Sequence, residues 1–281
     1  MFRDLYLVPL LIFIFSYIFI YLGNKKAYNI FLYLIYGGFA AQSALLFGWL
    51  YVNGFNLMPV DNIVFFNAWL LMVVVVLFTL FYRARYILVY ITPVVALNLL
   101  IAFFAPHNAV KPLAFQGQDL SVLLLHIILV LIGDSIFALA FIISLIYILQ
   151  ERKIKLKKNL KLFNKKEIPF YEFFYLGKGY NLELLDSINY QCLKIGFPLI
   201  TLGIAVGIYL SSSIFKSFMI AKPIEIISLI TWLIYAVLLH ERIARGVRGK
   251  KAAVFSIIGF LFIVSSLSFS LYLFPKFHGL K

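Results

Sequence analysis

The feature that most constrains the fold of this chain is a series of apolar runs, each long enough to cross a lipid bilayer. A membrane-spanning helix needs about 20 consecutive apolar residues to cross the hydrocarbon core. Hydrophobic residues make up 64% of the 281 residues, more than a soluble domain of this length needs for its core. The sequence therefore predicts an all-α, polytopic integral membrane protein with about eight transmembrane helices. The predicted spans are residues 5–22, 28–51, 62–81, 86–105, 120–150, 192–211, 224–240 and 252–274.

The first apolar run, residues 5–22, is expected to be a transmembrane helix rather than a cleavable signal peptide. It is long enough to span a bilayer, and it lacks a small-residue cleavage site. The fifth run is long, and we expect its inner end to continue past the bilayer as a cytoplasmic helix. Only one sizeable loop is expected, at residues 151–191. We therefore predict a single integral membrane domain over residues 1–281.

The distribution of the 25 Lys and Arg residues predicts the orientation of the chain in the membrane. Cytoplasmic loops carry the excess of cations in multi-pass membrane proteins. With the N-terminus placed outside, 19 of the 25 cations fall on the cytoplasmic side and 6 on the exterior side. We therefore expect both termini to be exterior, the loop 151–191 to be cytoplasmic, and the protein to lie in the cell (inner or plasma) membrane. The formal net charge of +14 then reflects topology, and no nucleic-acid partner is expected.

Three of the four histidines fall on the exterior side of this predicted topology. His107 lies in an outer loop, His126 lies near the outer end of the fifth span, and His278 lies just past the eighth. His240 alone lies at the inner boundary, where the apolar run 226–239 meets a basic cluster. Neutral imidazole is a usual axial ligand of haem iron, so two histidines of different helices at one depth could hold a haem between them. The alternative is that all of them are ordinary polar residues of the membrane interface.

Asp134 is the other costly polar group, because a carboxyl inside a membrane must be protonated, paired or hydrated. It lies about two turns below His126, roughly 12 Å deeper along the same helix. It could pair with a polar group of a neighbouring helix, or line a cavity beneath a bound cofactor. Close by, Gly133, Ala140 and Ser144 form a small-residue stripe that lets another helix approach closely.

Four ordered segments carry a family resemblance. Residues 182–210 are LELLDSINYQCLKIGFPLITLGIAVGIYL, with an acidic, Leu-rich helix start and a Gly-Phe-Pro sequence. Residues 230–260 are ITWLIYAVLLHERIARGVRGKKAAVFSIIGF, in which a histidine precedes a cluster of basic residues. The segments MPVDNIVFFNAW (58–69) and LLLHIILVLIGDSIFALAFIISLIYILQERKIKLK (123–157) fit the same pattern. From about Pro59 onward the chain resembles the cytochrome c assembly family of haem-handling membrane proteins, which includes the CcsA-type subunit of the system II cytochrome c synthase and its HemX-like relatives.

The resemblance implies a role for three histidines. His126 and His278 match the two external haem-ligating histidines of the family. His240 matches the histidine of an intramembrane haem site that is reached from the cytoplasm. The resemblance further implies that haem b is bound, and that a system II partner membrane protein and apocytochrome c are partners.

The chain departs from the family pattern in the outer loop 211–225. The synthases of the family carry a tryptophan-rich haem-presenting motif there, whereas this loop contains no tryptophan. Lys216 and Lys222 of the loop are candidates to neutralise the propionates of a bound haem. The sequence also contains no second intramembrane histidine to partner His240.

Two functions stay open at this point. The first is a haem-binding membrane protein that delivers or retains haem at the outer face of the membrane during cytochrome c maturation. The second is a HemX-like accessory protein that influences tetrapyrrole biosynthesis without transferring haem. A small-molecule transporter fits the composition, but no helix pair broken by Gly or Pro marks a midplane site. Any enzymatic role would be at most that of one part of a haem lyase or cytochrome c synthase complex, and the single cysteine, Cys192, excludes an internal disulfide and a CxxC redox pair.

Overall fold

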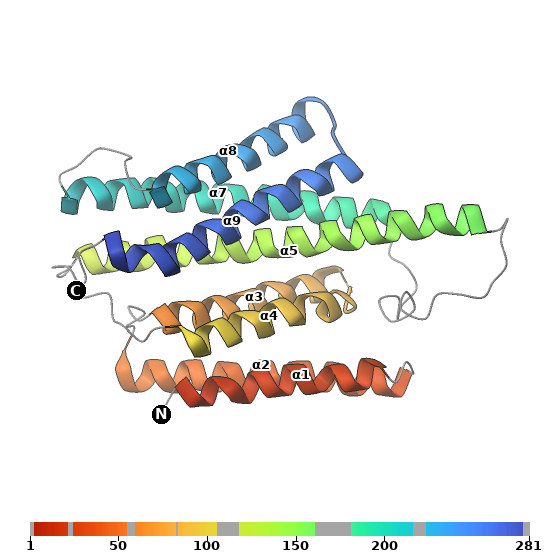
Figure 1. Ribbon diagram of the computed structural model, residues 1–281, viewed down its shortest axis with the longest axis horizontal. Coiled ribbons are helices and arrows are strands. Elements are labelled where there is room, and N and C mark those ends of the chain that lie inside the picture. Colours follow the sequence, from red (N-terminus) through yellow and green to blue (C-terminus); the bar gives the residue numbers. More distant parts are fainter. Residues whose placement is uncertain are drawn as a thin grey trace. The chain divides into compact units, whose positions relative to one another are not determined.

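The computed structural model describes residues 3–21, 25–54, 60–82, 84–105, 118–160, 181–215 and 223–277. These residues are helical almost throughout, and no strand occurs among them. The elements, in chain order, are η1 (Arg3–Tyr6), α1 (Leu7–Tyr21), α2 (Lys25–Asn53), α3 (Val60–Tyr82), α4 (Ile87–Phe104), α5 (Gln118–Leu160), α7 (Leu182–Phe215), α8 (Pro223–Ala244) and α9 (Lys250–Phe277) (Figure 1).

The all-α, polytopic membrane fold expected from the sequence is confirmed. Among the described residues, seven helical segments are long and apolar enough to cross a membrane, and each overlaps one of the predicted spans. The eighth predicted span, 252–274, lies inside α9. Hydropathy therefore located each helix, because a run that crosses a bilayer must be apolar over most of its length.

The expected continuation of the fifth helix past its apolar run is confirmed, whereas the start of the sixth helix predicted at residue 192 is too late. The helix α5, drawn in green in Figure 1, continues to Leu160, since the residues after the apolar run are mainly good helix formers such as Lys, Glu and Leu. The helix α7 begins at Leu182, well before residue 192. Asn181 caps it, because the Asn181 Oδ1 atom accepts the backbone N–H of Glu183 at 3.0 Å.

Two compact units make up the chain, and each is described by itself. The first comprises Met1–Leu113 with Lys155–Gly179, and the second comprises Ala114–Ile154 with Tyr180–Lys281. The candidate site residues that the structure describes, His126, Asp134 and His240, all belong to the second unit.

In the first unit, α1 packs along α2 and α3 packs along α4 (Figure 1). The helices α1 and α2 approach closely at Gly38, where an added Cβ would lie 2.6 Å from the Phe13 ring. The Tyr6 hydroxyl donates a hydrogen bond to the Asn62 Oδ1 atom at 2.8 Å, and its ring stacks on Phe65 with the centroids 4.2 Å apart. Aromatic contacts and one glycine thus join η1, α1, α2 and α3.

The second unit brings α5, α7, α8 and α9 together around one apolar core. Phe137 of α5 stacks on Tyr235 of α8 with the ring centroids 3.7 Å apart. Gly196 of α7 makes room for Phe137 and Gly259 of α9 makes room for Tyr235, because an added Cβ would lie 2.7 Å and 2.8 Å, respectively, from those rings. Small residues at these contacts let the helix backbones approach one another. The buried core residues are Phe137, Leu193, Ile200, Tyr235, Leu238, Ala252 and Ile263.

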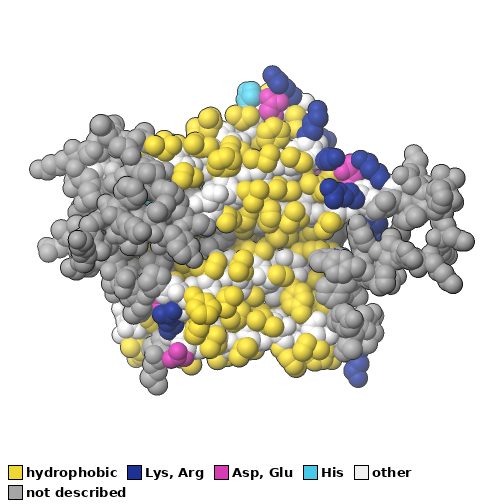
Figure 2. Space-filling view, viewed as in Figure 1, with side chains coloured by type: hydrophobic (Ala, Val, Ile, Leu, Met, Phe, Trp, Pro, Cys, Tyr) yellow, Lys and Arg dark blue, Asp and Glu magenta, His cyan; other side chains and the backbone are white. Residues whose placement is uncertain are grey.

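The outer faces of the helices carry many large apolar side chains. Leu11 is 61% exposed, Phe81 is 80% exposed and Phe104 is 71% exposed. Figure 2 shows hydrophobic side chains over much of the visible surface of the helices, with few charged ones among them. A surface of this extent and polarity is suited to contact with lipid rather than with water.

Candidate functional site

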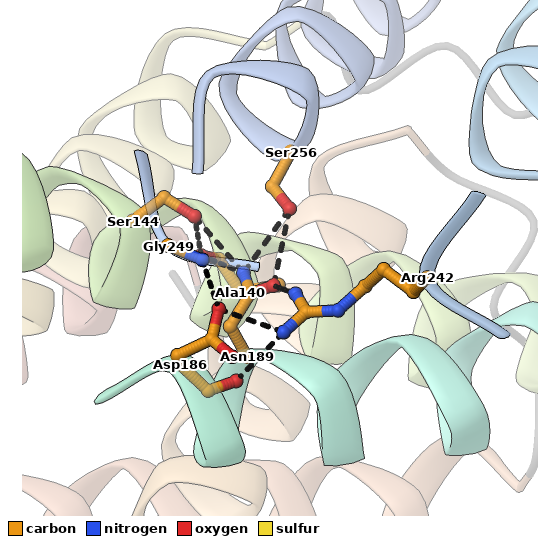
Figure 3. Close-up of polar contacts among 7 residues, drawn as sticks. All are labelled: Ala140, Ser144, Asp186, Asn189, Arg242, Gly249 and Ser256. Atoms are coloured by element: carbon orange, nitrogen blue, oxygen red, sulfur yellow. Dashed lines mark hydrogen bonds and ion pairs between the residues drawn. The ribbon is translucent and has the colours of Figure 1, made fainter. Parts of the chain in front are cut away.

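A buried polar cluster joins the four helices of the second unit (Figure 3). The Arg242 side chain, from the last turn of α8, is 2% exposed and lies between two residues of α7. Its Nη2 atom donates to the Asp186 Oδ1 atom at 2.7 Å and to the Asp186 carbonyl at 3.1 Å. Its Nη1 atom donates to the Asn189 Oδ1 atom at 2.6 Å. The Asp186 Oδ1 atom also accepts the backbone N–H of Gly249, just before α9, at 2.8 Å.

Asn189 extends the cluster to the other two helices. Its Nδ2 atom lies 3.2 Å from the Ala140 carbonyl and 2.9 Å from the Ser144 Oγ atom, both on α5, and 3.1 Å from the Ser256 Oγ atom of α9. An amide NH₂ has two hydrogens, so these three oxygens share them. The small-residue stripe seen in the sequence is therefore confirmed as a packing surface of α5, since it brings a carbonyl and a hydroxyl within reach of α7.

The polar cluster holds helices together and leaves little capacity for a ligand. A buried ion pair is stable only where further hydrogen bonds satisfy both partners, and each partner here has them. The sequence does not predict the cluster, because the predicted span begins at residue 192, after Asp186 and Asn189, and Arg242 stands only among the cations of the cytoplasmic side. The spacing of Asp186 and Asn189 indicates that both lie on one face of a helix, because residues three apart share a face.

His126 of α5 lies half-buried against α7. The His126 Nδ1 atom lies 2.7 Å from the carbonyl oxygen of Gly203. A Cβ added at Gly207 would lie 2.8 Å from the His126 Cε1 atom, so the ring rests on bare backbone there. A histidine with one ring nitrogen on a carbonyl is the usual arrangement of a metal-ligating imidazole, so His126 fits the haem ligation expected of it.

His240 is exposed, on the outer face of α8. It shares this face with Leu233, which is 55% exposed, and Val237, which is 45% exposed. Arg242, two residues further along the helix, is buried on the opposite side. Among the described residues no group of three or more His, Cys, Asp and Glu side chains could hold a metal ion.

Asp134 lies half-buried on α5, within electrostatic range of the Tyr235 hydroxyl of α8. Tyr235 also lies within such range of Cys192 on α7, and its hydroxyl donates to the Ser256 carbonyl of α9 at 3.5 Å. Both alternatives that the sequence left open for Asp134 therefore stay open.

Comparison with known proteins identifies the family. The family model described as "Cytochrome C assembly protein" matches residues 38–274. The chain belongs to this cytochrome c assembly family. The match includes both units and ends four residues before His278.

Curated relatives named "Cytochrome c biogenesis protein CcsA" match shorter stretches. The protein of Cyanophora paradoxa is 43% identical over 79 residues, which are 28% of this chain and 24% of that protein. The protein of Microcystis aeruginosa is 41% identical over 81 residues, 29% of this chain and 25% of that protein. The protein of Solanum lycopersicum is 29% identical over 157 residues, 50% of this chain and 49% of that protein. The chain thus matches between a quarter and a half of the length of these relatives, and no solved structure matches it.

Four of the sequence predictions for this family member fall outside the described residues. His107 and His278 are two of them, and Lys216 and Lys222 are the others. Their roles stay predictions from the sequence and from the resemblance.

Proposed function

We propose that the chain is a haem-binding membrane protein of cytochrome c maturation, which delivers or retains haem at the outer face of the membrane. Membership of the cytochrome c assembly family supports a role in that process. The observation that carries the haem-binding part is the contact between His126 Nδ1 and the Gly203 carbonyl, which leaves one imidazole nitrogen for iron. In this proposal His126 and His278 are the axial ligands of haem b, and Lys216 and Lys222 neutralise its propionates.

The other candidate residues take secondary places in the proposal. His240 stands at the cytoplasmic end, where haem would be taken up, and its exposure on α8 leaves it accessible there. Asp134 lies below His126, next to Tyr235, where it supplies a polar group beneath the haem. Apocytochrome c and a system II partner membrane protein are the proposed partners. The missing tryptophans make this chain at most one part of a haem lyase complex.

Axial ligation is tested by adding hemin to the haem-free protein in mild detergent and recording the Soret band. We expect His126→Ala and His278→Ala each to weaken hemin binding by more than about tenfold, since loss of even an outer-shell partner costs about 10- to 100-fold in metal affinity. Added imidazole should partly restore the band. His107→Ala is the matched control, as a third histidine predicted on the exterior side. If both ligand variants keep the wild-type Soret band, the exterior site is not formed by these residues, and the HemX-like accessory function becomes the better proposal.

Topology is tested separately, with reporter fusions. A reporter fused after residue 281 should read as exterior, and a reporter inserted within 161–180 should read as cytoplasmic, because 19 of the 25 cations then lie inside. An insertion near residue 109, which the cation distribution predicts to be exterior, gives an independent test position. The reverse pattern would place His126 at the cytoplasmic face and would remove the basis of an exterior haem site.

A further inference from the structure

The protonation of the His126 ring follows from its contact with α7. Gly203 offers a backbone carbonyl oxygen 2.7 Å from the Nδ1 atom. A carbonyl oxygen can only accept a hydrogen bond, so the Nδ1 atom carries the hydrogen. In a neutral imidazole the Nε2 atom then holds the free lone pair. Among the described residues the ring's hydrogen bond is made by Nδ1, and Nε2 is left as the nitrogen that can bind a metal.

Gly207 explains how the ring reaches that carbonyl. An added Cβ would lie 2.8 Å from the His126 Cε1 atom, 3.1 Å from Nδ1 and 3.7 Å from Nε2. Real Cβ atoms do not approach other carbon atoms so closely, so any larger residue at 207 would push the ring away. Because Gly207 has no side chain, the His126 ring can lie close to the α7 backbone. Gly207 is one helical turn from Gly203, whose carbonyl the ring contacts.

The same packing recurs along the contact between α5 and α7, which fixes the register of His126. Phe137 sits on Gly196 and Val130 sits on Gly203, with an added Cβ 2.7 Å and 2.8 Å away, respectively. With the two helices exchanged, Ile200 of α7 packs on Gly133 of α5, where an added Cβ would lie 2.6 Å from the Ile200 side chain. His126 on Gly207 is the polar member of this series. Its position is thus set by the packing of two helices rather than by its own side-chain torsions.

We propose that Gly203 and Gly207 are positioning residues for the haem ligand His126. The Gly203 carbonyl selects the Nδ1–H tautomer and makes Nε2 the more basic nitrogen, and the bare backbone at Gly207 holds the ring in the plane that this hydrogen bond requires. The inference rests on the proposed function, because it assumes that His126 binds haem iron. It names the ligating atom and adds two residues that never touch the haem.

The test combines two measurements on the full chain in detergent. Nitrogen-15 NMR of labelled histidines in the haem-free protein reports the tautomer of His126, with the signal assigned by its loss in His126→Ala. Hemin titration, followed by the Soret band, reports the affinity for haem. We expect the wild type to show the Nδ1–H tautomer. We expect Gly207→Ala to give a mixture of tautomers and to bind hemin about 10- to 100-fold more weakly, which is the effect of losing an outer-shell hydrogen bond.

Two glycine variants provide matched controls. Gly37→Ala adds the same methyl group in α2, where an added Cβ meets nothing within 4 Å. Gly48→Ala adds the same methyl group further along α2, where an added Cβ likewise meets nothing within 4 Å. Both should keep the wild-type tautomer, and both should bind hemin within about threefold of the wild type, because neither touches the ring or its acceptor.

The outcomes separate this inference from the function on which it rests. A wild type that binds no hemin would overturn the proposed function, and the inference with it. A wild type that binds hemin but shows the Nε2–H tautomer would overturn the inference alone. The same holds if Gly207→Ala keeps full affinity, or if Gly48→Ala loses as much affinity as Gly207→Ala.

Discussion

Replacing Arg242 with alanine should lower the free energy of unfolding of the second unit by about 3–5 kcal/mol, the usual cost of removing one partner of a buried ion pair. The Asp186 carboxylate would then be left beside α8 without the guanidinium that lies 2.7 Å from it. The Asn189 Oδ1 atom would lose its shorter hydrogen bond and keep only the 3.4 Å one from the Ser256 hydroxyl. The polar contacts that Arg242 makes with α7 would thus be lost together.

The single cysteine offers a direct measurement of this loss. Cys192 lies on α7, fully buried, so a thiol-reactive dye can label it only after the second unit opens. Arg242→Ala should lower the temperature at which labelling begins in mild detergent. Arg245→Ala is the matched control, because Arg245, just past the end of α8, is 73% exposed and pairs with Glu241 of α8, an i,i+4 interaction worth about 0.3–0.5 kcal/mol. Equal effects of the two substitutions would show that the Arg242 ion pair does not hold the unit together.

Tyr235→Ala is the second substitution with a large expected effect, a loss of about 3–5 kcal/mol in the free energy of unfolding. Tyr235 is among the largest fully buried side chains, and its ring lies between Phe137 and the backbone at Gly259. Truncation would leave a cavity between α5, α8 and α9 that rigid helices can fill only in part. The Cys192 labelling assay applies here as well.

Two controls separate ring packing from the other properties of Tyr235. Tyr209→Ala removes the same side chain from α7 at a position that is 59% exposed, and it should cost less than about 0.5 kcal/mol. Tyr235→Phe removes only the hydroxyl, whose hydrogen bond to the Ser256 carbonyl is long, and it should cost within about 1 kcal/mol. A Tyr235→Phe variant as unstable as Tyr235→Ala would show that the hydroxyl and its neighbour Asp134, rather than the packing of the ring, stabilise the second unit.

The sequence was sufficient for the transmembrane fold and for the extension of α5, and insufficient for the start of α7. Apolar runs identify spans because lipid demands apolar side chains along the whole crossing. The first turns of α7 contain Asp186 and Asn189, which read as loop residues in a hydropathy pattern. They are helical because partners on other helices satisfy their polar atoms, and hydropathy carries no information about such partners.

The candidate site was predictable only in part, for the same reason. The depth of His126 follows from counting residues along one helix. Its hydrogen bond to Gly203 depends on the register between α5 and α7, which is set by glycines on one helix opposite large side chains on the other. The outward-facing side of α8 that carries His240 likewise follows from which face of the helix meets its neighbours. A single sequence reports spacing along an element, not the pairing of two elements.

The ion pair between α7 and α8 also orders events during biosynthesis. Asp186 precedes Arg242 by 56 residues in the chain. At about 5–20 residues per second, it therefore leaves the ribosome roughly 3–11 s before the guanidinium that neutralises it. Throughout that interval α7 carries Asp186 without its partner, although the contacts of Asn189 with α5 can already form. The second unit should therefore assemble only after its last two helices have been made, and a nascent chain that stops short of Arg242 would leave an incomplete bundle for membrane proteases to remove.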